Sequence, residues 1–499
     1  MAQYRRLLWV AGLIVGLLLV VVLTRALMMP SYRASAESAP ASAFDAAQIA
    51  ARLSEAVKLR TISWQPGAAA EDVEASKAAF VAFRDWIEKT YPEFSKTATR
   101  EIVSDYTLVF TWAGSDPSLK PILLMSHMDV VPIAPGSEGN WTHPPFDGAI
   151  ADGFVWGRGS MDTKEGIVGM LEAAEKLIAG GFKPKRTIMF SFGHDEELGG
   201  HQGNEKVAEL LKSRKTALEF VVDEGGLITK GVVPNVEPPV ALIGVAEKGY
   251  VTLDLVAKAD GGHSSLPPPA AETAIGRLAR AVGRVSDAPF KSGIDGVPRE
   301  AMLKMAPAMG FGTRLAIANL WLFEPVVVKT MTKSTAASAN IQTTIAPTII
   351  SGGNKDNVMP PEATASVNFR IHPRDTIKGV VEHVTEAIGD DKIEIKVRDG
   401  ARDPSPTSDT AGPDYAFLKT TLEKLMPGVI VVPNLMSGGT DARYFQELTP
   451  NVFRMIPAVM GPDDMKGFHG TNERLPVASL PLIADFYTAL MREAGAAEK

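Results

Sequence analysis

The chain has 499 residues, of which 22% are charged and 45% hydrophobic, and its formal net charge is −7. This length is sufficient for two or three domains with sizeable cores, and the acidic balance gives no support to nucleic-acid binding. The sequence contains no cysteine, which excludes disulfides, thiolate metal sites and cysteine nucleophiles.

The amino-terminal residues form a separate unit. Arg5 and Arg6 precede the uncharged apolar run Leu7–Leu23, whose length is at the bottom of the range for a membrane-spanning helix and exceeds the usual core of a signal peptide. The arginines place the amino terminus in the cytoplasm by the positive-inside rule. We therefore expect residues 1–29 to be an uncleaved signal anchor and the rest of the chain to lie outside the cytoplasm, on the periplasmic, extracellular or lumenal side.

A cleaved signal peptide, which would give a secreted protein, is the alternative for residues 1–29. The Ala-x-Ala tripeptides at Ala34–Ala36 and Ala41–Ala43 would permit cleavage, although they lie far from the apolar run. Residues 30–43 are rich in Ala, Ser and Pro and are typical of a linker.

Apolar strand-like stretches alternate with helical periodicity over residues 44–244. Repeated βαβ units of this kind predict an α/β fold, with a mixed, mostly parallel sheet that helices cover on both faces. The first of two helices between Phe44 and Tyr91 is expected to be capped by Asp45. The other helices and strands expected here are Tyr106–Trp112, Pro121–Ser126, Lys164–Ala179, Thr187–Phe192, Asn204–Arg214 and Leu218–Val222.

Polar residues follow three of the expected strands. His127 comes after the second strand, Glu196 and Glu197 after the third, and Asp223 after the fourth. The carboxyl ends of parallel strands share one edge of the sheet, where ligands bind in such folds. Adjacent carboxylates repel one another unless a cation or a proton lies among them. This edge is therefore a candidate metal site, although the acidic turn at residues 195–197, taken alone, is equally compatible with a solvated loop.

From about residue 245 the pattern changes. An alternating strand, a helix and two further strands are expected at Tyr250–Ala257, Ala271–Arg284, Ile341–Ile350 and Ala363–His372. We therefore expect a smaller α+β domain at residues 245–374, inserted into a large domain that is made of residues 44–244 and 375–499.

Five residues are candidate metal ligands: His127, Asp162, Glu197, Asp223 and His469. Imidazole nitrogens and carboxylate oxygens suit zinc, and also cobalt or manganese. In two-metal sites the ions lie roughly 3.5–4 Å apart, a spacing that a bridging carboxylate would hold. Asp162 follows a glycine-rich turn, which lets the backbone approach an ion closely, whereas a lone Asp in such a turn is usually a helix N-cap.

Eight motifs resemble those of a known family. They are SHMDVVP at 126–132, GRGSMDTKEG at 157–166, SFGHDEELGG at 191–200, DEGG at 223–226, GGHSS at 261–265, NVMPPEATASVNFRIHP at 357–373, GGTDARYF at 438–445 and FHGTNERL at 468–475. The chain thereby resembles the two-zinc peptidase family of aminoacylase, acetylornithine deacetylase and carboxypeptidase G, and most of all its branch of carboxypeptidase S and the N-acyl-amino-acid hydrolases. The resemblance implies a zinc-exopeptidase-like fold with an inserted domain of ferredoxin-like type.

The resemblance also assigns roles to the candidate ligands. It implies two Zn²⁺ per subunit, with Asp162 as the bridge between them. His127 and Asp223 would complete one metal site, and Glu197 and His469 would complete the other.

Residues beside these ligands match other parts of the family's catalytic machinery. Glu196 matches the general base, which takes a proton from the attacking water and later delivers it to the leaving amine. Asp129 would orient the His127 imidazole through its second nitrogen, with capping of the following loop as the alternative. Thr163 stands where many relatives have Asp, and in the family the peptide bond after the bridging Asp162 is often cis.

Further residues match the family's substrate-binding positions. His263, within GGHSS, matches the histidine that stabilises the tetrahedral oxyanion and that comes from the partner subunit in dimeric members. Arg370 matches the arginine that holds the substrate's free carboxylate, a task suited to a bidentate guanidinium; a strand-surface arginine is the alternative. Asn340 is a weaker match to a substrate-contacting Asn. The residues expected to line the carboxylate end of the pocket are Gly438, Gly439 and Thr440.

These matches imply an amidohydrolase that cleaves the amide before a carboxyl-terminal amino acid, in a peptide or in an N-acyl amino acid with a free carboxylate. The alternatives are a reversible N-acyl amino acid synthase/hydrolase and, from another class, a non-catalytic peptide-binding protein. The last would have lost the base or part of the ligand set, and the sequence retains both. The apolar, Met-rich stretch Ala301–Val328 would either line an acyl pocket or serve as core or as the face of a homodimer.

Overall fold

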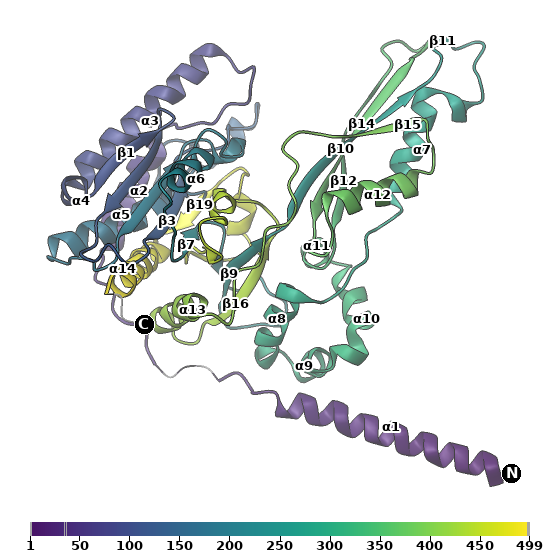
Figure 1. The fold of residues 1–499 in the computed structure, drawn as a ribbon, viewed down its shortest axis with the longest axis horizontal. Helices are drawn as coiled ribbons and strands as arrows, with labels where there is room; N and C mark the ends of the chain where they lie inside the picture. Colours follow the sequence, from purple (N-terminus) through teal and green to yellow (C-terminus); the bar gives the residue numbers. More distant parts are fainter. Residues whose placement is uncertain (1, 34, 36, 497–499) are drawn as a thin grey trace.

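The computed structural model describes residues 2–33, 35 and 37–496, and it has two sheets in two domains of unequal size (Figure 1). Two residues of the first Ala-x-Ala tripeptide, Ala34 and Ala36, lie outside the described residues. The predicted α/β class is confirmed, because the larger sheet is mixed and mostly parallel and a separate, smaller sheet is antiparallel.

The larger sheet contains ten strands, among them those predicted in residues 44–244. Its central pairs β3–β6, β3–β7 and β7–β17 are parallel. Antiparallel pairs occur toward both edges. In spatial order the strands are β1 (Thr99–Val103), β2 (Thr107–Trp112), β6 (Ile188–Gly193), β3 (Ile122–His127), β7 (Val221–Asp223), β17 (Val452–Arg454), β9 (Val240–Glu247), β8 (Leu227–Thr229) and β18 (Val459–Met460), with β16 (Ile430–Met436) paired to β9.

Every residue of β3 and β6 is buried, because helices cover both faces of the sheet. Successive side chains of a strand point to opposite faces, so Leu124 packs in the core cluster under α2, α5 and α14, whereas Leu123 and Met125 pack under α6. This explains why these strands are continuous apolar runs instead of alternating ones. The helices involved are α2 (Ala46–Lys58), α5 (Lys164–Ala179), α6 (Asn204–Ser213) and α14 (Leu480–Ala496).

Several local features that the sequence analysis predicts are present in the large domain. The side chain of Asp45 accepts a hydrogen bond from the backbone N–H of Ala47 and so caps α2, as expected. The second predicted helix follows as α3 (Ala70–Thr90). The peptide bond between Asp162 and Thr163 is cis.

The smaller domain extends further along the chain than expected. Its antiparallel sheet has the order β12 (Thr344–Gly352), β14 (Glu362–Ile371), β10 (Gly249–Lys258), β15 (Ile393–Val397), and the helices α7 (Ala274–Ser286) and α12 (Ile377–Ile388) pack on it. Val380, Val384 and Ile388 of α12 are buried in the same core cluster as Leu253 and Val367. The apolar face of α12 and the pairing of β15 with β10 thus associate residues 377–397 with the smaller sheet, beyond the expected boundary at residue 374.

Helices occupy most of the Met-rich stretch. They are α8 (Gly296–Met305), α9 (Phe311–Ala318), α10 (Leu320–Met331) and, beyond it, α11 (Thr335–Ala339). Met305 and Met309 pack against a cluster made by β9 and β16, and Met302 packs against Leu320 and Ile341. These methionines therefore contribute to the core.

At the amino terminus, α1 (Ala2–Met28) is the one described helix that is long and apolar enough to cross a membrane, and it extends away from both domains (Figure 1). Length and composition alone would also suit a signal sequence. The predicted apolar helix is thus present, and its end that leads into the chain lies beside α9 (Figure 1).

A buried ion pair joins β9 to β17. Arg454 is 0% and Glu247 2% exposed, and the Arg454 Nη2 lies 2.7 Å from the Glu247 Oε1. The hydroxyl of Thr440 also donates to this carboxylate oxygen, at 2.9 Å. Removing one partner of a buried pair leaves the other charge buried without compensation.

We expect Arg454→Ala to destabilise the large domain by ~3–5 kcal/mol, since the Glu247 carboxylate would stay buried without its main partner. A urea titration followed by tryptophan fluorescence measures the effect. Arg398→Ala is the control, because Arg398 pairs with Asp254 on the protein surface and should cost no more than ~1 kcal/mol. Equal shifts of the two midpoints would contradict the prediction.

Candidate metal centre

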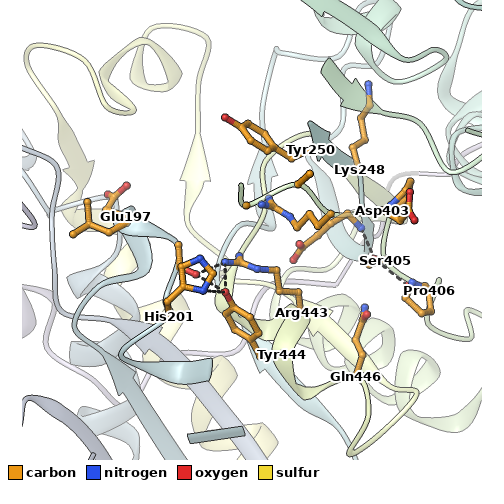
Figure 2. Close-up of a pocket in the computed structure, with 17 residues that line it drawn as sticks. Glu197, His201, Lys248, Tyr250, Asp403, Ser405, Pro406, Arg443, Tyr444 and Gln446 are labelled. Atoms are coloured by element: carbon orange, nitrogen blue, oxygen red, sulfur yellow. Dashed lines mark hydrogen bonds between the residues drawn. The ribbon is translucent and has the colours of Figure 1, made fainter. Parts of the chain in front are cut away.

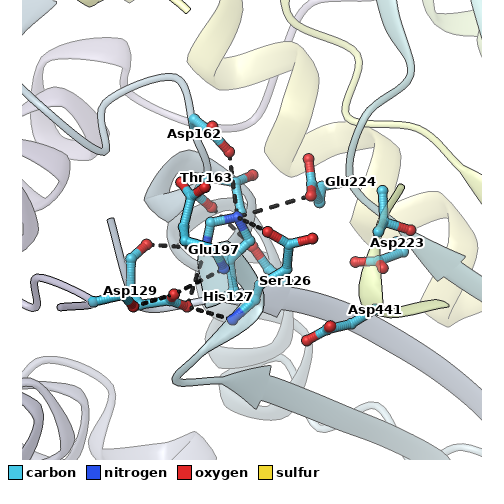
Figure 3. Close-up of polar contacts among 12 residues, drawn as sticks. Ser126, His127, Asp129, Asp162, Thr163, Glu197, Asp223, Glu224 and Asp441 are labelled. Atoms are coloured by element: carbon cyan, nitrogen blue, oxygen red, sulfur yellow. Dashed lines mark hydrogen bonds and ion pairs between the residues drawn. The ribbon is translucent and has the colours of Figure 1, made fainter. Parts of the chain in front are cut away.

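Four of the five predicted ligands, His127, Asp162, Glu197 and His469, come together at the carboxyl-terminal edge of the large sheet; Figure 3 shows the first three. The His127 Nε2 lies 3.2 Å from the Asp162 Oδ1. The other Asp162 oxygen, Oδ2, lies 2.7 Å from the His469 Nε2, which is also 3.2 Å from the Glu197 Oε2. Asp162 therefore faces one histidine with each of its two oxygens, which is the arrangement that a bridging ligand needs.

Glu224, the neighbour of the expected ligand Asp223, also approaches His127. The Glu224 Oε1 lies 3.8 Å from the His127 Nε2 (Figure 3), and ligand atoms of His127, Glu196 and Glu224 all lie within 4.8 Å of one another. The Asp223 Oδ2 instead accepts a hydrogen bond from the backbone N–H of Ala442, at 2.9 Å. Asp223 ends β7, and its carboxylate also interacts electrostatically with His127, so both members of this acidic pair are candidate ligands beside that histidine.

Burial sets the electrostatics of the centre. It raises the pKa of the Glu196 and Glu224 carboxyls well above their usual value. Burial also opposes the ionisation of Asp162, yet hydrogen bonds with the two histidines hold its pKa below the usual range. A divalent cation would stabilise such buried carboxylates as anions. Imidazole nitrogens and carboxylate oxygens gathered in this way fit zinc.

Asp129 holds the loop that follows β6. Its two carboxylate oxygens accept hydrogen bonds from the backbone N–H groups of Glu196 and Glu197, each at 3.1 Å, and the Ser63 hydroxyl donates to one of them. The His127 Nδ1 lies 2.9 Å from the Asp129 carbonyl oxygen and 3.4 Å from its Oδ1. Since Nδ1 faces Asp129, the His127 Nε2 is left to face the other carboxylates.

Comparison with known proteins gives the family. Residues 123–493, which contain the whole centre, match the family model "Peptidase family M20/M25/M40". The chain belongs to this family.

Named M20 relatives include a probable carboxypeptidase S-like 2 of Dictyostelium discoideum, which is 37% identical over 454 residues that cover 89% of this chain and 85% of that protein. The N-fatty-acyl-amino acid synthase/hydrolase PM20D1 of Homo sapiens is 39% identical over 427 residues, with 84% of each chain covered. Carboxypeptidase S of Saccharomyces cerevisiae is 31% identical and covers 85% of this chain and 80% of that protein. The chain is therefore an M20 hydrolase. Its relatives include both carboxypeptidase S and an N-fatty-acyl-amino acid synthase/hydrolase.

Solved structures show the same M20 fold. An M20 family metallo-carboxypeptidase from Sulfolobus solfataricus has a TM-score of 0.64 at 18% identity, over 90% of this chain and 99% of that chain. Human carnosine dipeptidase 1 has a TM-score of 0.61 at 16% identity, over 90% of this chain and 97% of that chain. The predicted family and fold are confirmed.

A second buried ion pair ties the two chain segments of this M20 centre together. The Arg158 Nη1 donates to the Glu473 Oε2 at 2.5 Å, and its Nη2 donates to the carbonyl oxygen of His469 at 3.3 Å. The Glu473 Oε1 accepts the backbone N–H groups of Gly159, Met161 and Asp162, at 2.9, 3.0 and 3.2 Å. Each side chain thus fixes the loop that carries the other segment's ligand.

The substrate residues predicted from the motifs lie in different places. His263, in β11 (Gly262–His263), is exposed at the tip of the smaller domain, far from the large sheet (Figure 1). One chain alone therefore does not bring His263 to the metal centre. Asn340 caps the end of α11, and its Nδ2 donates to the Ala336 carbonyl oxygen. Arg370 is half-buried at the end of β14.

A cleft of about 640 Å³ between the two domains contains Glu197, Tyr250 and Arg402 (Figure 2). The guanidinium carbons of Arg370 and Arg402 lie 5.0 and 5.5 Å from the centre of the Tyr250 ring. Among the described residues, neither arginine forms an ion pair. Burial lowers the pKa of both guanidinium groups. Together they concentrate positive charge in the cleft, where Glu247 is the carboxylate that interacts electrostatically with Arg402.

Sequence reasoning missed Arg402. A β-bridge between Tyr250 and Arg402 brings it to the cleft, and no motif surrounds it. A Cβ at Gly439 would lie 2.1 Å from the Arg402 Nη2, so this guanidinium packs against the Gly439 backbone. The expectation that Gly438, Gly439 and Thr440 line the carboxylate end of the pocket stays a prediction.

We expect Glu473→Ala to lower both the zinc content and the unfolding midpoint. The Arg158 guanidinium and three backbone N–H groups would lose their acceptor, and breaking a buried pair costs ~3–5 kcal/mol. Metal analysis after dialysis and a thermal melt measure the two effects. Glu447→Ala is the matched control, because the Glu447 side chain is 71% exposed and pairs with Lys212. Full zinc content in Glu473→Ala would disprove the role of the pair.

Two variants distinguish between Asp223, the last residue of β7, and Glu224, which follows it. We expect Glu224→Ala to bind one zinc ion fewer than the wild type, because the carboxylate beside His127 is removed. Asp223→Asn should retain the wild-type content, since its amide oxygen still accepts the Ala442 N–H. Metal analysis measures the zinc content of the wild type and the two variants. Loss of zinc in Asp223→Asn but not in Glu224→Ala would show instead that Asp223 is the ligand.

Proposed function

We propose that the chain is a two-zinc amidohydrolase that releases a carboxyl-terminal amino acid from a peptide or from an N-acyl amino acid. The observation that carries the proposal is the arrangement of one cleft. Glu197, from the candidate metal centre, and Arg402, from the arginine pair, both line it. A substrate carboxylate at the arginines would therefore fix which amide bond lies at the metal centre.

The residues that would hold the metal ions form two sets that share Asp162. His127 and Glu224 belong to one set, and Glu197 and His469 belong to the other. Zinc ions bound there would polarise the scissile carbonyl and lower the pKa of a water molecule, and cobalt or manganese would suit the same donors.

Glu196 is the proposed general base. Its carboxyl lies among His127 and Glu224, and its backbone is held by Asp129. It would take a proton from the attacking water and deliver that proton to the leaving amine nitrogen. Asp129 acts as a positioning residue, because it fixes the peptide that carries this carboxylate and the orientation of the His127 ring.

His263 would reach an active site only in an assembly. Its exposed place at the tip of the smaller domain suits a histidine that enters the cleft of a second subunit, where it would stabilise the oxyanion. This role requires a homodimer. The exposed edge strand β12, with Ile349 and Ile350 56% and 67% exposed, is compatible with one.

Two substrate classes are proposed because relatives of both names share more than 30% identity with the chain. One group carries the name carboxypeptidase S or carboxypeptidase S-like, and the other N-fatty-acyl-amino acid synthase/hydrolase. The second name includes synthesis, so reversible condensation is a second candidate activity. We also propose that α1 is an uncleaved anchor that places both domains outside the cytoplasm, with secretion after cleavage as the alternative.

The test uses the detergent-solubilised full chain loaded with zinc. Mass spectrometry would follow the turnover of a mixed panel of dipeptides and long-chain N-acyl amino acids, with Glu196→Gln as the inactive control. A preference for acyl amino acids supports a lipid amino-acid hydrolase, and a preference for dipeptides supports a carboxypeptidase. No turnover of either class, with wild type equal to the variant, would overturn the proposal in favour of a binding protein.

We expect Arg402→Met to raise KM by roughly 10- to 100-fold with little change in kcat, because a hydrogen bond to a charged group contributes ~1.5–3 kcal/mol. The same substrate with an amidated carboxyl terminus should be cleaved equally poorly by wild type and variant. Arg398→Met serves as the control, since Arg398 does not line the cleft and its exposed side chain pairs with Asp254. An unchanged KM would remove Arg402 from the substrate site.

A further inference from the structure

The carboxyl-terminal end of α1 is fastened to the turn between α9 and α10. The Asn319 Nδ2 donates to the carbonyl oxygen of Val22 at 3.0 Å, and the Arg25 Nε donates to the carbonyl oxygen of Ala318 at 3.1 Å. Val22 is 5% and Ala26 0% exposed, whereas nearly all of α1 before Val22 is exposed. The depth at which this end of α1 lies in a bilayer therefore also fixes the depth of α9 and α10.

That depth is the outer surface of the hydrocarbon layer. At 1.5 Å per residue, the apolar run Leu7–Leu23 is ~26 Å long, slightly shorter than a hydrocarbon core of ~30 Å. Val22 stands at the end of this run. The segment that holds Val22, here called the α9–α10 corner (Phe311–Met331), consequently lies at the level of the lipid headgroups when α1 spans the bilayer (Figure 1).

The α9–α10 corner exposes large apolar side chains. Phe311 is 46%, Trp321 55%, Leu322 38% and Val326 62% exposed. Contiguous exposed apolar residues of this kind mark an interaction surface. Tryptophan in particular is enriched at membrane–water interfaces, where its ring lies at the headgroup level.

Charge on and around the corner is mainly positive. Arg314 and Lys329 lie in the corner and Lys333 follows it, whereas Glu324 is the single acidic residue between residues 311 and 333, in a chain whose net charge is −7. The Glu324 Oε1 accepts the backbone N–H of Ile294 and so serves the fold. Basic residues beside an apolar helical face are typical of helices that lie in the interface of anionic membranes.

We propose that the α9–α10 corner is a second membrane contact, which enters the outer-leaflet interface of the same bilayer that α1 crosses. The contact gives the catalytic body a fixed orientation on the membrane. The start of the linker supports this, because the Tyr32 N–H donates to the Pro307 carbonyl oxygen at 3.1 Å and its hydroxyl donates to the Gly428 carbonyl oxygen at 2.6 Å. The linker is thus bound to the body of the protein at Tyr32.

The proposal rests on the uncleaved anchor and is independent of the substrate assigned above. It does have a consequence for that substrate. Amphiphilic acids with a long acyl chain partition into the same interface, so an enzyme body held there meets them at a higher local concentration than soluble dipeptides.

The absence of cysteine makes the experiment direct. A single cysteine is introduced into the full chain as Val326→Cys or Phe311→Cys, labelled with an environment-sensitive fluorophore and reconstituted into nanodiscs of phosphatidylcholine with a minority of phosphatidylglycerol. Brominated acyl chains on the phosphatidylcholine quench labels in contact with lipid, and iodide quenches labels in water. Leu19→Cys in α1 gives the lipid reference, and Ile102→Cys, 42% exposed on β1 of the large domain, gives the water reference.

We expect lipid quenching at positions 311 and 326 to approach that at position 19 and to exceed that at position 102 several-fold, with iodide showing the opposite order. Labels at 311 and 326 that behave like the label at 102 would overturn the proposal. Protection from iodide without lipid quenching would also overturn it, because a second copy or a protein partner would then cover the corner. Zinc content equal to that of the wild type verifies that each labelled variant is folded, so a failed membrane contact is distinguished from a failed metal centre.

Discussion

The buried pair of Arg158 and Glu473 is the contact on which the metal centre depends. More than 300 residues of chain separate the two partners, including the whole of the smaller domain. Arg158 holds the carbonyl group of His469, and Glu473 holds the backbone on both sides of Met161, including Asp162. A bridging carboxylate and a histidine that come from distant segments need such a link, since ligand geometry is effective only when the surrounding groups are themselves fixed.

The same logic repeats at Asp129, which fixes the other half of the centre. One carboxylate joins the end of β3, through His127, to the loop after β6, through the N–H groups of Glu196 and Glu197. Both links are buried charges that satisfy several backbone donors at once, which offsets the cost of removing them from water. Glu196 and Glu224 lack this compensation, and burial raises their pKa values. A cation beside them would therefore stabilise their ionised forms.

Much of the fold could be predicted from the sequence because its signals are local. The apolar runs at β3 and β6 need only burial on both faces, and their polar ends mark the edge where His127 and Glu197 lie. The missed features depend on contacts between distant segments. The approach of Glu224 to His127 depends on how the chain leaves β7, the pairing of β15 with β10 places this strand in the smaller sheet, and a β-bridge with Tyr250 brings Arg402 to the cleft.

The division of the cleft between two domains makes their relative position part of the chemistry. The candidate metal ligands belong to the large domain, whereas Arg370 and Tyr250 belong to the smaller sheet. Between β9 and β10, Lys248 is buried, and its Nζ donates to the carbonyl oxygens of Ala339 and Gln342. A substrate bound at both the candidate metal centre and these arginines would span this junction, so the inter-domain geometry would decide where its scissile bond lies. Helices α8–α10 lie between these parts of the molecule, because α8 packs on β16 and α9 packs on α1. Through them, the position of the two domains relative to each other is coupled to the orientation of the protein on a membrane.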